Sequence, residues 1–298
     1  MTIWQEKLGK DYRLEIYLHV WGLERDPFTP DLPAPEAFVP SQREELIKLK
    51  EVLMEGRVAV LTGGLGMGKT AVCKFLTAAL REENVVFQDP ARQVIPVMIH
   101  GAAYRSAEEF LRAIILGLEL DSNMDSVKMF EVLRKWGIEQ KEKLAIIVDD
   151  VPESTANFKE LGEFFRVLAD LPGISLLLNG EEKRMENFLE KIPALKDRVY
   201  FRMKLRPLTL PEVRELLIAR MRYCSREERD FMSGPITADG FQEIYKVSKG
   251  VPRQILAAAS KALRLAAIWS SPINAQIVRM ANRETLRERL AKIFLRKR

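Results

Sequence analysis

The chain has 298 residues, of which 47% are hydrophobic and 30% are charged, and it carries a formal net charge of +5. This composition is that of a soluble globular protein, and it excludes a disordered chain, a collagen-like chain and a coiled-coil rod. The mildly basic charge permits a polyanionic partner without requiring one.

Neither a membrane span nor a secretion signal is expected. The longest uncharged stretch, Leu265 to Val278, is shorter than the roughly 20 apolar residues that cross a bilayer. The N-terminus lacks the apolar run of a secretion signal, so we expect a cytoplasmic protein without membrane insertion. Cys73 and Cys224 are the only cysteines, and we expect both to be buried rather than paired or bound to zinc. His19 and His100 are expected to have structural packing roles.

The chain opens on a short segment followed by a proline-rich stretch. Five prolines lie between Pro27 and Pro40, and no helical periodicity runs through them. We therefore expect residues 1–40 to form an N-terminal segment and an extended arm; a flexible linker is the alternative.

Short apolar runs alternate with helical patterns through the middle of the chain. Five runs predict strands, at residues 57–61, 94–99, 144–148, 174–178 and 199–203. The first four are nearly continuous, as in parallel strands covered by helices on both faces. Helical spacing between them supplies the crossovers of right-handed βαβ units. Residues 41–205 are therefore predicted to form an α/β domain, a parallel sheet flanked by helices.

The pattern changes after Pro207, where helices follow one another without a strand. They are predicted at residues 211–222, 236–247, 253–269 and 273–295. We interpret residues 206–298 as a smaller all-helical domain. Its last helix is amphipathic and basic, and either docks on this domain or contacts nucleic acid.

A phosphate-binding motif lies between the first strand and the helix after it. The segment Gly63 to Thr70, GGLGMGKT, fits the pattern GxxxxGK[ST]. Its backbone N–H groups would surround the nucleotide phosphates, Lys69 would reach the β- and γ-phosphates, and Thr70 would hold Mg²⁺. The residues expected to bind ATP are Gly63, Gly64, Leu65, Gly66, Met67, Gly68, Lys69, Thr70 and Ala71.

Polar side chains end the third and fourth apolar runs. Asp149 would lie at the carboxyl edge of the sheet beside the Mg²⁺, and Asp150 would orient or activate the attacking water. The alternative for this pair is a solvated strand end or a helix cap. Asn179 could help to position the water if its strand lies between those of the phosphate loop and Asp149. A turn asparagine before Gly180 is the alternative.

Taken in chain order, these motifs resemble the AAA+ ATPases, in the branch of ExeA-type secretion ATPases, transposition helpers and origin-recognition initiators. The resemblance covers about residues 18 to 270. Residues 21–28, WGLERDPF, are similar to the "GL…PF" opening of ExeA-type proteins. Five further segments resemble family motifs in the same order. Residues 42–46 resemble the start of the next helix, and residues 179–180 resemble the sensor-1 turn. Residues 193–199 resemble the arginine-finger segment, residues 205–209 the junction to the lid, and residues 250–253 the sensor-2 GxPR motif.

The resemblance implies an additional strand between those of the phosphate loop and Asp149, and assembly into rings or filaments. It also implies that Arg198 acts on the nucleotide of a neighbouring subunit and Arg253 on that of its own. A surface ion pair is the alternative for Arg198, with Arg202 and Arg206 as rival fingers. For Arg253 the alternative is a surface residue at a helix start.

The functional hypothesis is an ATPase that oligomerises with ATP and acts on duplex DNA, as a transposition or replication helper would. The alternative is a nucleotide-dependent switch or assembly factor for a protein partner, such as a secretion or pilus apparatus. Relatives in this branch usually have Asp-Glu where this chain has Asp149-Asp150, which implies slow hydrolysis. Asp149-Asp150-Val151 also resembles the signal-transduction ATPases with numerous domains, whose nucleotide often acts as a switch. The additional membrane or winged-helix domains of the relatives are not expected here.

Overall fold

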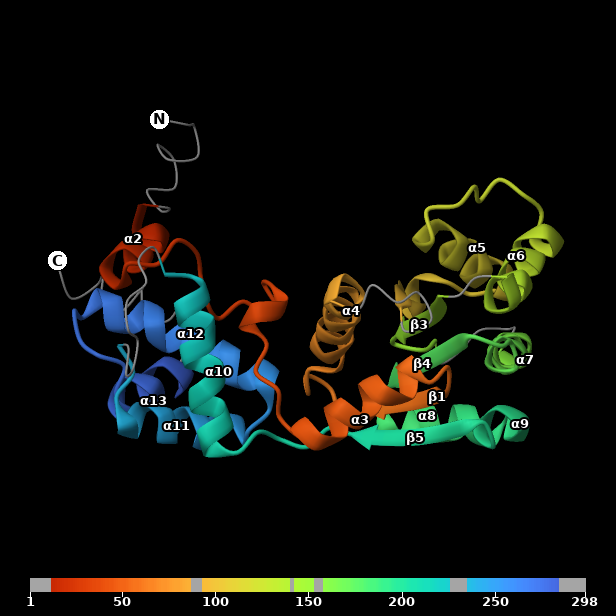
Figure 1. The fold of residues 1–298 in the computed structure, drawn as a ribbon. Helices are drawn as coiled ribbons and strands as arrows, with labels where there is room; N and C mark the ends of the chain where they lie inside the picture. The colour runs from red at the N-terminus through yellow and green to blue at the C-terminus, as the bar shows by residue number, and fades with distance from the viewer. Residues whose placement is uncertain (1–11, 87–92, 140–141, 153–157, 226–234, 284–298) are drawn as a thin grey trace. The chain divides into compact units, whose positions relative to one another are not determined.

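The computed structural model describes residues 12–86, 93–139, 142–152, 158–225 and 235–283 (Figure 1). The chain divides into two compact units, one of residues 42–206 and one of residues 1–41 with 207–298. Each unit has its own cluster of buried apolar side chains. No helix within the described ranges has the length and apolar character needed to cross a membrane.

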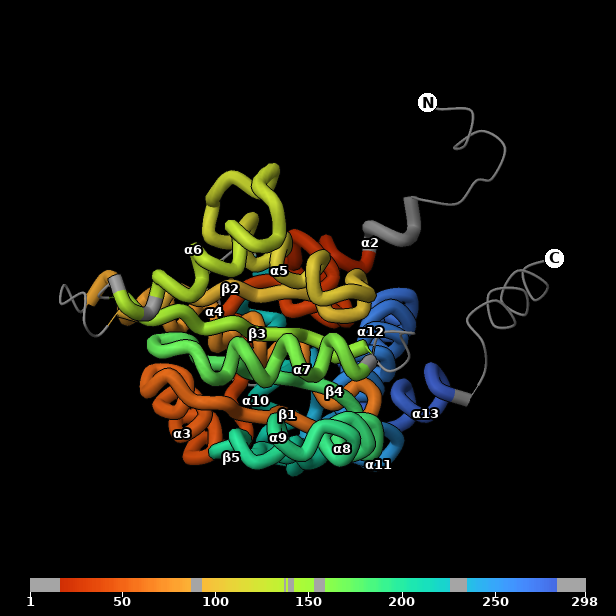
Figure 2. The backbone as a smooth tube through the Cα atoms, turned by 90° about the vertical axis from the view of Figure 1, so that its right-hand side faces the viewer, coloured from red at the N-terminus to blue at the C-terminus, as the bar shows by residue number. Residues whose placement is uncertain are grey.

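Residues 42–206 contain a five-stranded sheet in which every pairing is parallel. Its strands are β1 (Val58–Thr62), β2 (Val94–His100), β3 (Lys143–Asp149), β4 (Ile174–Gly180) and β5 (Val199–Lys204). The order is β2-β3-β4-β1-β5, which Figure 2 shows from top to bottom. The predicted α/β fold is confirmed. So is the additional strand that the resemblance implies, because β4 lies between β1 and β3.

Helices cover both faces of this sheet. They are α3 (Arg43–Met54), α4 (Lys69–Val86), α5 (Ala107–Gly117), α6 (Ser126–Glu139), α7 (Phe158–Ala169), α8 (Glu182–Glu190) and α9 (Pro193–Lys196), with a 3-10 turn η3 (Gly101–Ala103). Leu144, Ile146 and Val148 share a core with apolar residues of α5 to α9, and Figure 2 shows α7, α8 and α9 in front of the strands. Ala145 and Ile147 alternate with them toward the other face, where α3 and α4 contact the sheet.

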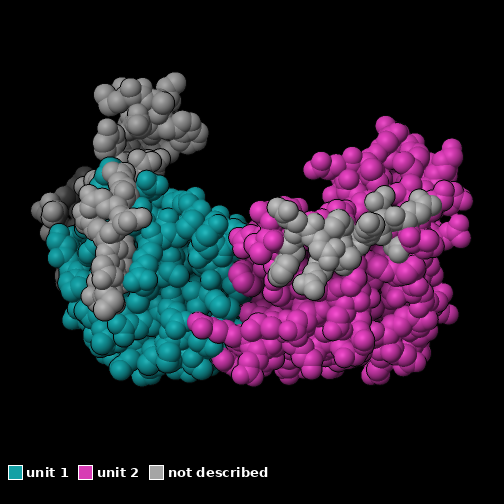
Figure 3. Space-filling view, viewed as in Figure 1, with its two compact units in different colours: residues 1–41, 207–298 teal, residues 42–206 magenta. Residues whose placement is uncertain are grey.

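The second unit, drawn in teal in Figure 3, is helical in its described part. It comprises α2 (Tyr12–Trp21), a 3-10 turn η1 (Pro35–Ala37), α10 (Leu210–Tyr223), α11 (Ala238–Ser248), α12 (Pro252–Ile268) and α13 (Ala275–Arg283). The helices predicted after Pro207 are present, with ends shifted by one or two residues up to α12. The last one is described only to Arg283, so residues 284–295 of that prediction lie outside the described part.

The N-terminal segment packs on these helices. Leu23 and Phe28 are buried in the same apolar cluster as residues of α10 to α13. The Asp26 carboxylate accepts hydrogen bonds from Ser260 Oγ at 3.0 Å and from Arg264 Nη2 at 3.1 Å. The segment therefore contributes to the core of the helical unit.

Candidate functional site

The glycine-rich loop joins β1 to the first turn of α4. Gly66 and Gly68 have φ values of 78° and 91°, in the left-handed region that side-chain-bearing residues rarely adopt. Lys69 begins the helix, and its Nζ donates to the carbonyls of Gly63 at 2.9 Å and Gly64 at 3.2 Å. The loop thus lies at a helix N-terminus with an ammonium group folded over it, which is an arrangement that favours phosphate.

Three predicted side chains meet at the carboxyl edge of the sheet. Thr70 Oγ1 donates a hydrogen bond of 3.0 Å to Asp149 Oδ1, and Asn179 Nδ2 donates to the same oxygen. Asp149 is 3% exposed and Asn179 is fully buried. They meet because Thr70 follows β1, Asn179 lies on β4 next to β1, and Asp149 lies on β3 next to β4. A threonine hydroxyl beside a carboxylate is the donor set that P-loop proteins use for Mg²⁺, so these residues fit that metal.

Asn179 also fixes the chain that follows β3. Its Oδ1 accepts from the Asp150 backbone N–H at 3.4 Å, and its own carbonyl accepts from Val151 N at 2.9 Å. Asp150 has a φ of 64°, and the residue is exposed. Asn179 Nδ2 also contacts Cys73 Sγ at 3.0 Å, and burial raises the pKa of that thiol to about 12, so it is neutral. Both cysteines are buried, as predicted.

His100 is a site residue that sequence reasoning missed. Its Nδ1 lies 3.1 Å from Asp149 Oδ2, and its side chain is 65% exposed, so the expectation of a packed histidine is wrong. The contact follows from register, since His100 at the end of β2 pairs with Asp149 at the end of β3. The backbone segments that follow β2 and β3 are closely packed, because a Cβ on Gly101 would lie 2.5 Å from the Asp150 carbonyl oxygen. The signal in the sequence was a polar residue ending a strand beside the strand of Asp149.

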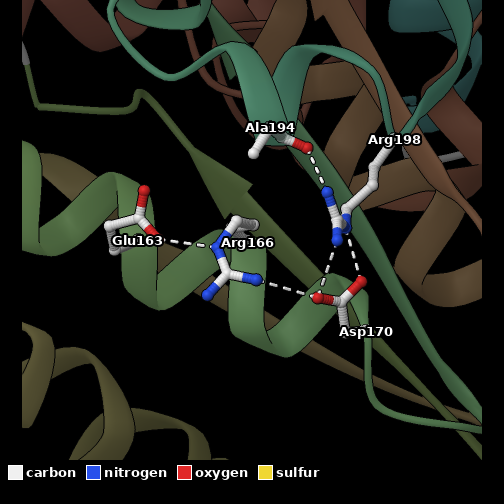
Figure 4. Close-up of polar contacts among 5 residues, drawn as sticks. All are labelled: Glu163, Arg166, Asp170, Ala194 and Arg198. Carbon is white, nitrogen blue, oxygen red and sulfur yellow. Dashed lines mark hydrogen bonds and ion pairs between the residues drawn. The ribbon is translucent and has the colours of Figure 1, made fainter.

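Arg198 lies at the opposite edge of the sheet. Arg198 precedes β5, whereas the phosphate loop follows β1. Because β1 and β5 are parallel neighbours, Arg198 lies at the amino ends of the strands and the phosphate loop at their carboxyl ends. A strand of six residues spans about 20 Å at 3.3 Å per residue. Figure 4 shows its guanidinium bound to the Asp170 carboxylate and to the Ala194 carbonyl.

The other predicted arginines lie elsewhere. Arg202 is exposed within β5. Arg206 follows the carboxyl end of β5, and its backbone N–H donates to Gln42 Oε1 at 3.0 Å. Arg253 is exposed in the first turn of α12, in the helical unit, and follows Gly250 with its φ of 76°.

Comparisons with known proteins agree with this fold. Residues 52–189 match the family described as AAA domain. No curated protein sequence matches the chain. ORC2 of Aeropyrum pernix, in ADPNP–ADP complexes, is 18% identical with a TM-score of 0.66 over 87% of this chain and 72% of that one. ORC1 of the same organism, in complex with DNA, is 19% identical with a TM-score of 0.66 over 90% and 72%. Cdc6p of Pyrobaculum aerophilum is 17% identical with a TM-score of 0.62 over 87% and 70%. The resemblance and the fold expected from the sequence motifs are confirmed.

Proposed function

This chain contains an AAA domain and has the fold of AAA+ proteins of the origin-initiator type, and from that premise we propose that it binds ATP with Mg²⁺ and hydrolyses the γ-phosphate. The observation that carries the proposal is the cluster of Thr70, Asp149 and Asn179 beside the loop that holds Lys69. Lys69 and the loop N–H groups would bind the phosphates, and Thr70 and Asp149 would hold the metal. Mg²⁺ would supply positive charge that offsets the charge developing on the phosphate oxygens.

The proposed roles at the hydrolytic step fall to Asp150 and Asn179. Asp150 follows the metal-binding carboxylate directly and is exposed at the same edge, where its carboxylate would orient the attacking water and accept its proton. Asn179 would hold the backbone of Asp150 in place through its side-chain carbonyl. Aspartate is one methylene shorter than glutamate, so we expect slow turnover.

Self-assembly is the next part of the proposal. Arg198 lies at the strand edge opposite the phosphate loop, so it would act on the nucleotide of a second copy rather than its own. Arg206, at the loop's own edge, fits this role less well. A contact between the carboxyl edge of one subunit and the amino edge of the next is head-to-tail, which generates a ring or a filament. Arg253 is proposed to act on its own subunit's nucleotide.

Duplex DNA is the proposed partner. Two structural neighbours, ORC1 of Aeropyrum pernix and ORC of Drosophila, are described in complex with or bound to DNA. The net charge of +5 is compatible with a polyanion. The nucleotide-dependent switch, which would bind a protein partner, is the second candidate, and the short carboxylate of Asp150 favours it.

The two candidates are separated by phosphate release from Mg-ATP, measured with and without duplex DNA. A DNA-acting ATPase predicts stimulation that falls steeply with salt and is lost in Lys69→Ala. Slow phosphate release that does not change on addition of DNA, together with tight nucleotide retention, would instead favour the nucleotide-dependent switch. Release that persists in Lys69→Ala would contradict both.

A further inference from the structure

Asp170 holds Arg198 through a fork of two hydrogen bonds. Asp170 follows α7 and lies 28 residues before Arg198 in the chain. Arg198 Nε donates to Asp170 Oδ1, and Nη2 donates to Oδ2 at 2.9 Å (Figure 4). Nη1 donates to the Ala194 carbonyl oxygen in α9. The guanidinium is therefore held from two sides by its own subunit.

The same guanidinium keeps donors available. Arginine has five N–H bonds, two of them on each terminal nitrogen. Nη1 and Nη2 each have one of the acceptors named above, and no other acceptor contacts Arg198 among the described residues. One N–H thus remains on each terminal nitrogen, and the side chain is 33% exposed. Guanidinium N–H groups suit the oxygens of a phosphate.

The Asp170 carboxylate is itself held firmly. Arg166 Nη1 donates to its Oδ2 at 3.0 Å, and Arg166 Nε donates to Glu163 at 2.6 Å, one turn away on α7. The helix is anchored in the core by the fully buried Leu161, Phe165 and Leu168. The hydrogen bond from Arg198 lowers the pKa of Asp170, so the carboxylate is charged at neutral pH.

We propose that Asp170 is a positioning residue that presents Arg198, with its free terminal N–H groups, to the γ-phosphate of ATP bound by a second copy of this chain. The inference rests on the proposed role of Arg198 in trans. A free arginine side chain samples many rotamers, and an anchored one loses less entropy when it binds the phosphate. The opposite arrangement, in which Asp170 withholds Arg198 until assembly, predicts that removing Asp170 speeds hydrolysis.

The test mixes subunits that are defective on opposite sides of the contact. Asp149→Asn subunits would bind ATP without hydrolysing it and still donate Arg198. Arg198→Ala subunits would keep a complete site but donate no arginine. Phosphate release from the mixture should exceed that of either variant alone. If the mixture gains nothing, Arg198 does not act in trans, and both that role and the inference are overturned.

The second step changes only the donor. With Asp149→Asn/Asp170→Asn as donor, the restored kcat should fall about tenfold while KM for ATP is unchanged, because only the placement of the arginine is altered. Asp149→Asn/Glu160→Gln is the matched control and should restore the full rate, since Glu160 is an exposed carboxylate in the first turn of the same helix and takes no part in the contacts of Arg166, Asp170 and Arg198. Asp149→Asn/Asp170→Glu keeps a carboxylate and should recover part of the rate. A restored rate that is equal or higher with Asp170→Asn would overturn the inference while leaving the role of Arg198 intact.

Discussion

Thr70 donates its hydroxyl hydrogen to Asp149 Oδ1 over 3.0 Å, which joins the second residue of α4 to the last residue of β3. These residues are 79 positions apart and meet because β1 and β3 end at the same edge of the sheet. They supply the oxygens that we propose for Mg²⁺. Substitutions of Thr70, Asp149 or the residues that contact them should therefore reduce metal-dependent hydrolysis more than they reduce nucleotide binding.

Replacing Asn179 with alanine should affect both stability and hydrolysis. The amide is fully buried and bonds to Asp149, Asp150 and Cys73, so its loss leaves buried polar groups unpaired. We expect a loss of about 1–3 kcal/mol in the free energy of unfolding, measured in urea. Phosphate release should fall about 100-fold, as when one stabilising donor is removed from an active site. Cys73→Ala is the control and should keep its hydrolysis; an Asn179→Ala protein that turns over at the wild-type rate would refute the assignment.

His100→Ala tests the residue that supports Asp149 from β2. Loss of a partner that orients a metal ligand typically costs 10–100-fold in metal affinity or activity. The Mg²⁺ concentration for half-maximal phosphate release should therefore rise, while ATP binding without metal stays the same. His19→Ala, an exposed histidine of α2, is the matched control and should show no change. Identical magnesium titrations for wild type and His100→Ala would argue against this role.

Local information in the sequence was sufficient for the strands and the phosphate loop. The continuous run before Gly63 and the helical pattern after Lys69 lie within a short window, and β1, the loop and α4 form there. The order of the strands is not local, since nothing in residues 174–178 specifies which strands lie beside them. The position of a strand between β1 and β3 was predicted from the resemblance to AAA+ ATPases, and the observed strand order confirms it.

Contacts between distant residues could not be predicted in the same way. Arg198 meets Asp170 from 28 positions away, and Arg264 meets Asp26 from 238 positions away, with no motif marking either partner. His100 needed the register between β2 and β3, which two apolar runs do not define. In each case the partner depends on how the elements pack.

Asp26→Ala should destabilise the helical unit. The carboxylate is 14% exposed and accepts from Phe28 N, Ser260 Oγ and Arg264 Nη2, so its removal leaves three donors unpaired. We expect about 1–3 kcal/mol less unfolding free energy, read from urea titrations. Glu24→Ala, a nearby exposed carboxylate, should stay close to wild type. Equal losses for the two variants would mean that the Asp26 contacts contribute nothing specific.

The ion pair of Asp170 and Arg198 should give a pH-dependent difference in stability. The pKa of Asp170 is lowered in the folded protein, below an unfolded value of about 3.9. The contribution of Asp170 to folding stability is therefore complete above its pKa in the unfolded chain. It is lost as pH falls through its pKa in the folded protein. The difference in Tm between wild type and Asp170→Asn should be present at neutral pH and shrink below about pH 4. A difference that grows as pH falls would contradict the pairing.

Asp149→Asn removes the carboxylate that we propose to hold the metal for hydrolysis of bound ATP. Phosphate release and ATP binding would be measured side by side across a magnesium titration. We expect the variant to bind ATP without metal as wild type does and to lose at least about 100-fold in magnesium-dependent phosphate release. Release at the wild-type rate, with the same magnesium dependence, would contradict it.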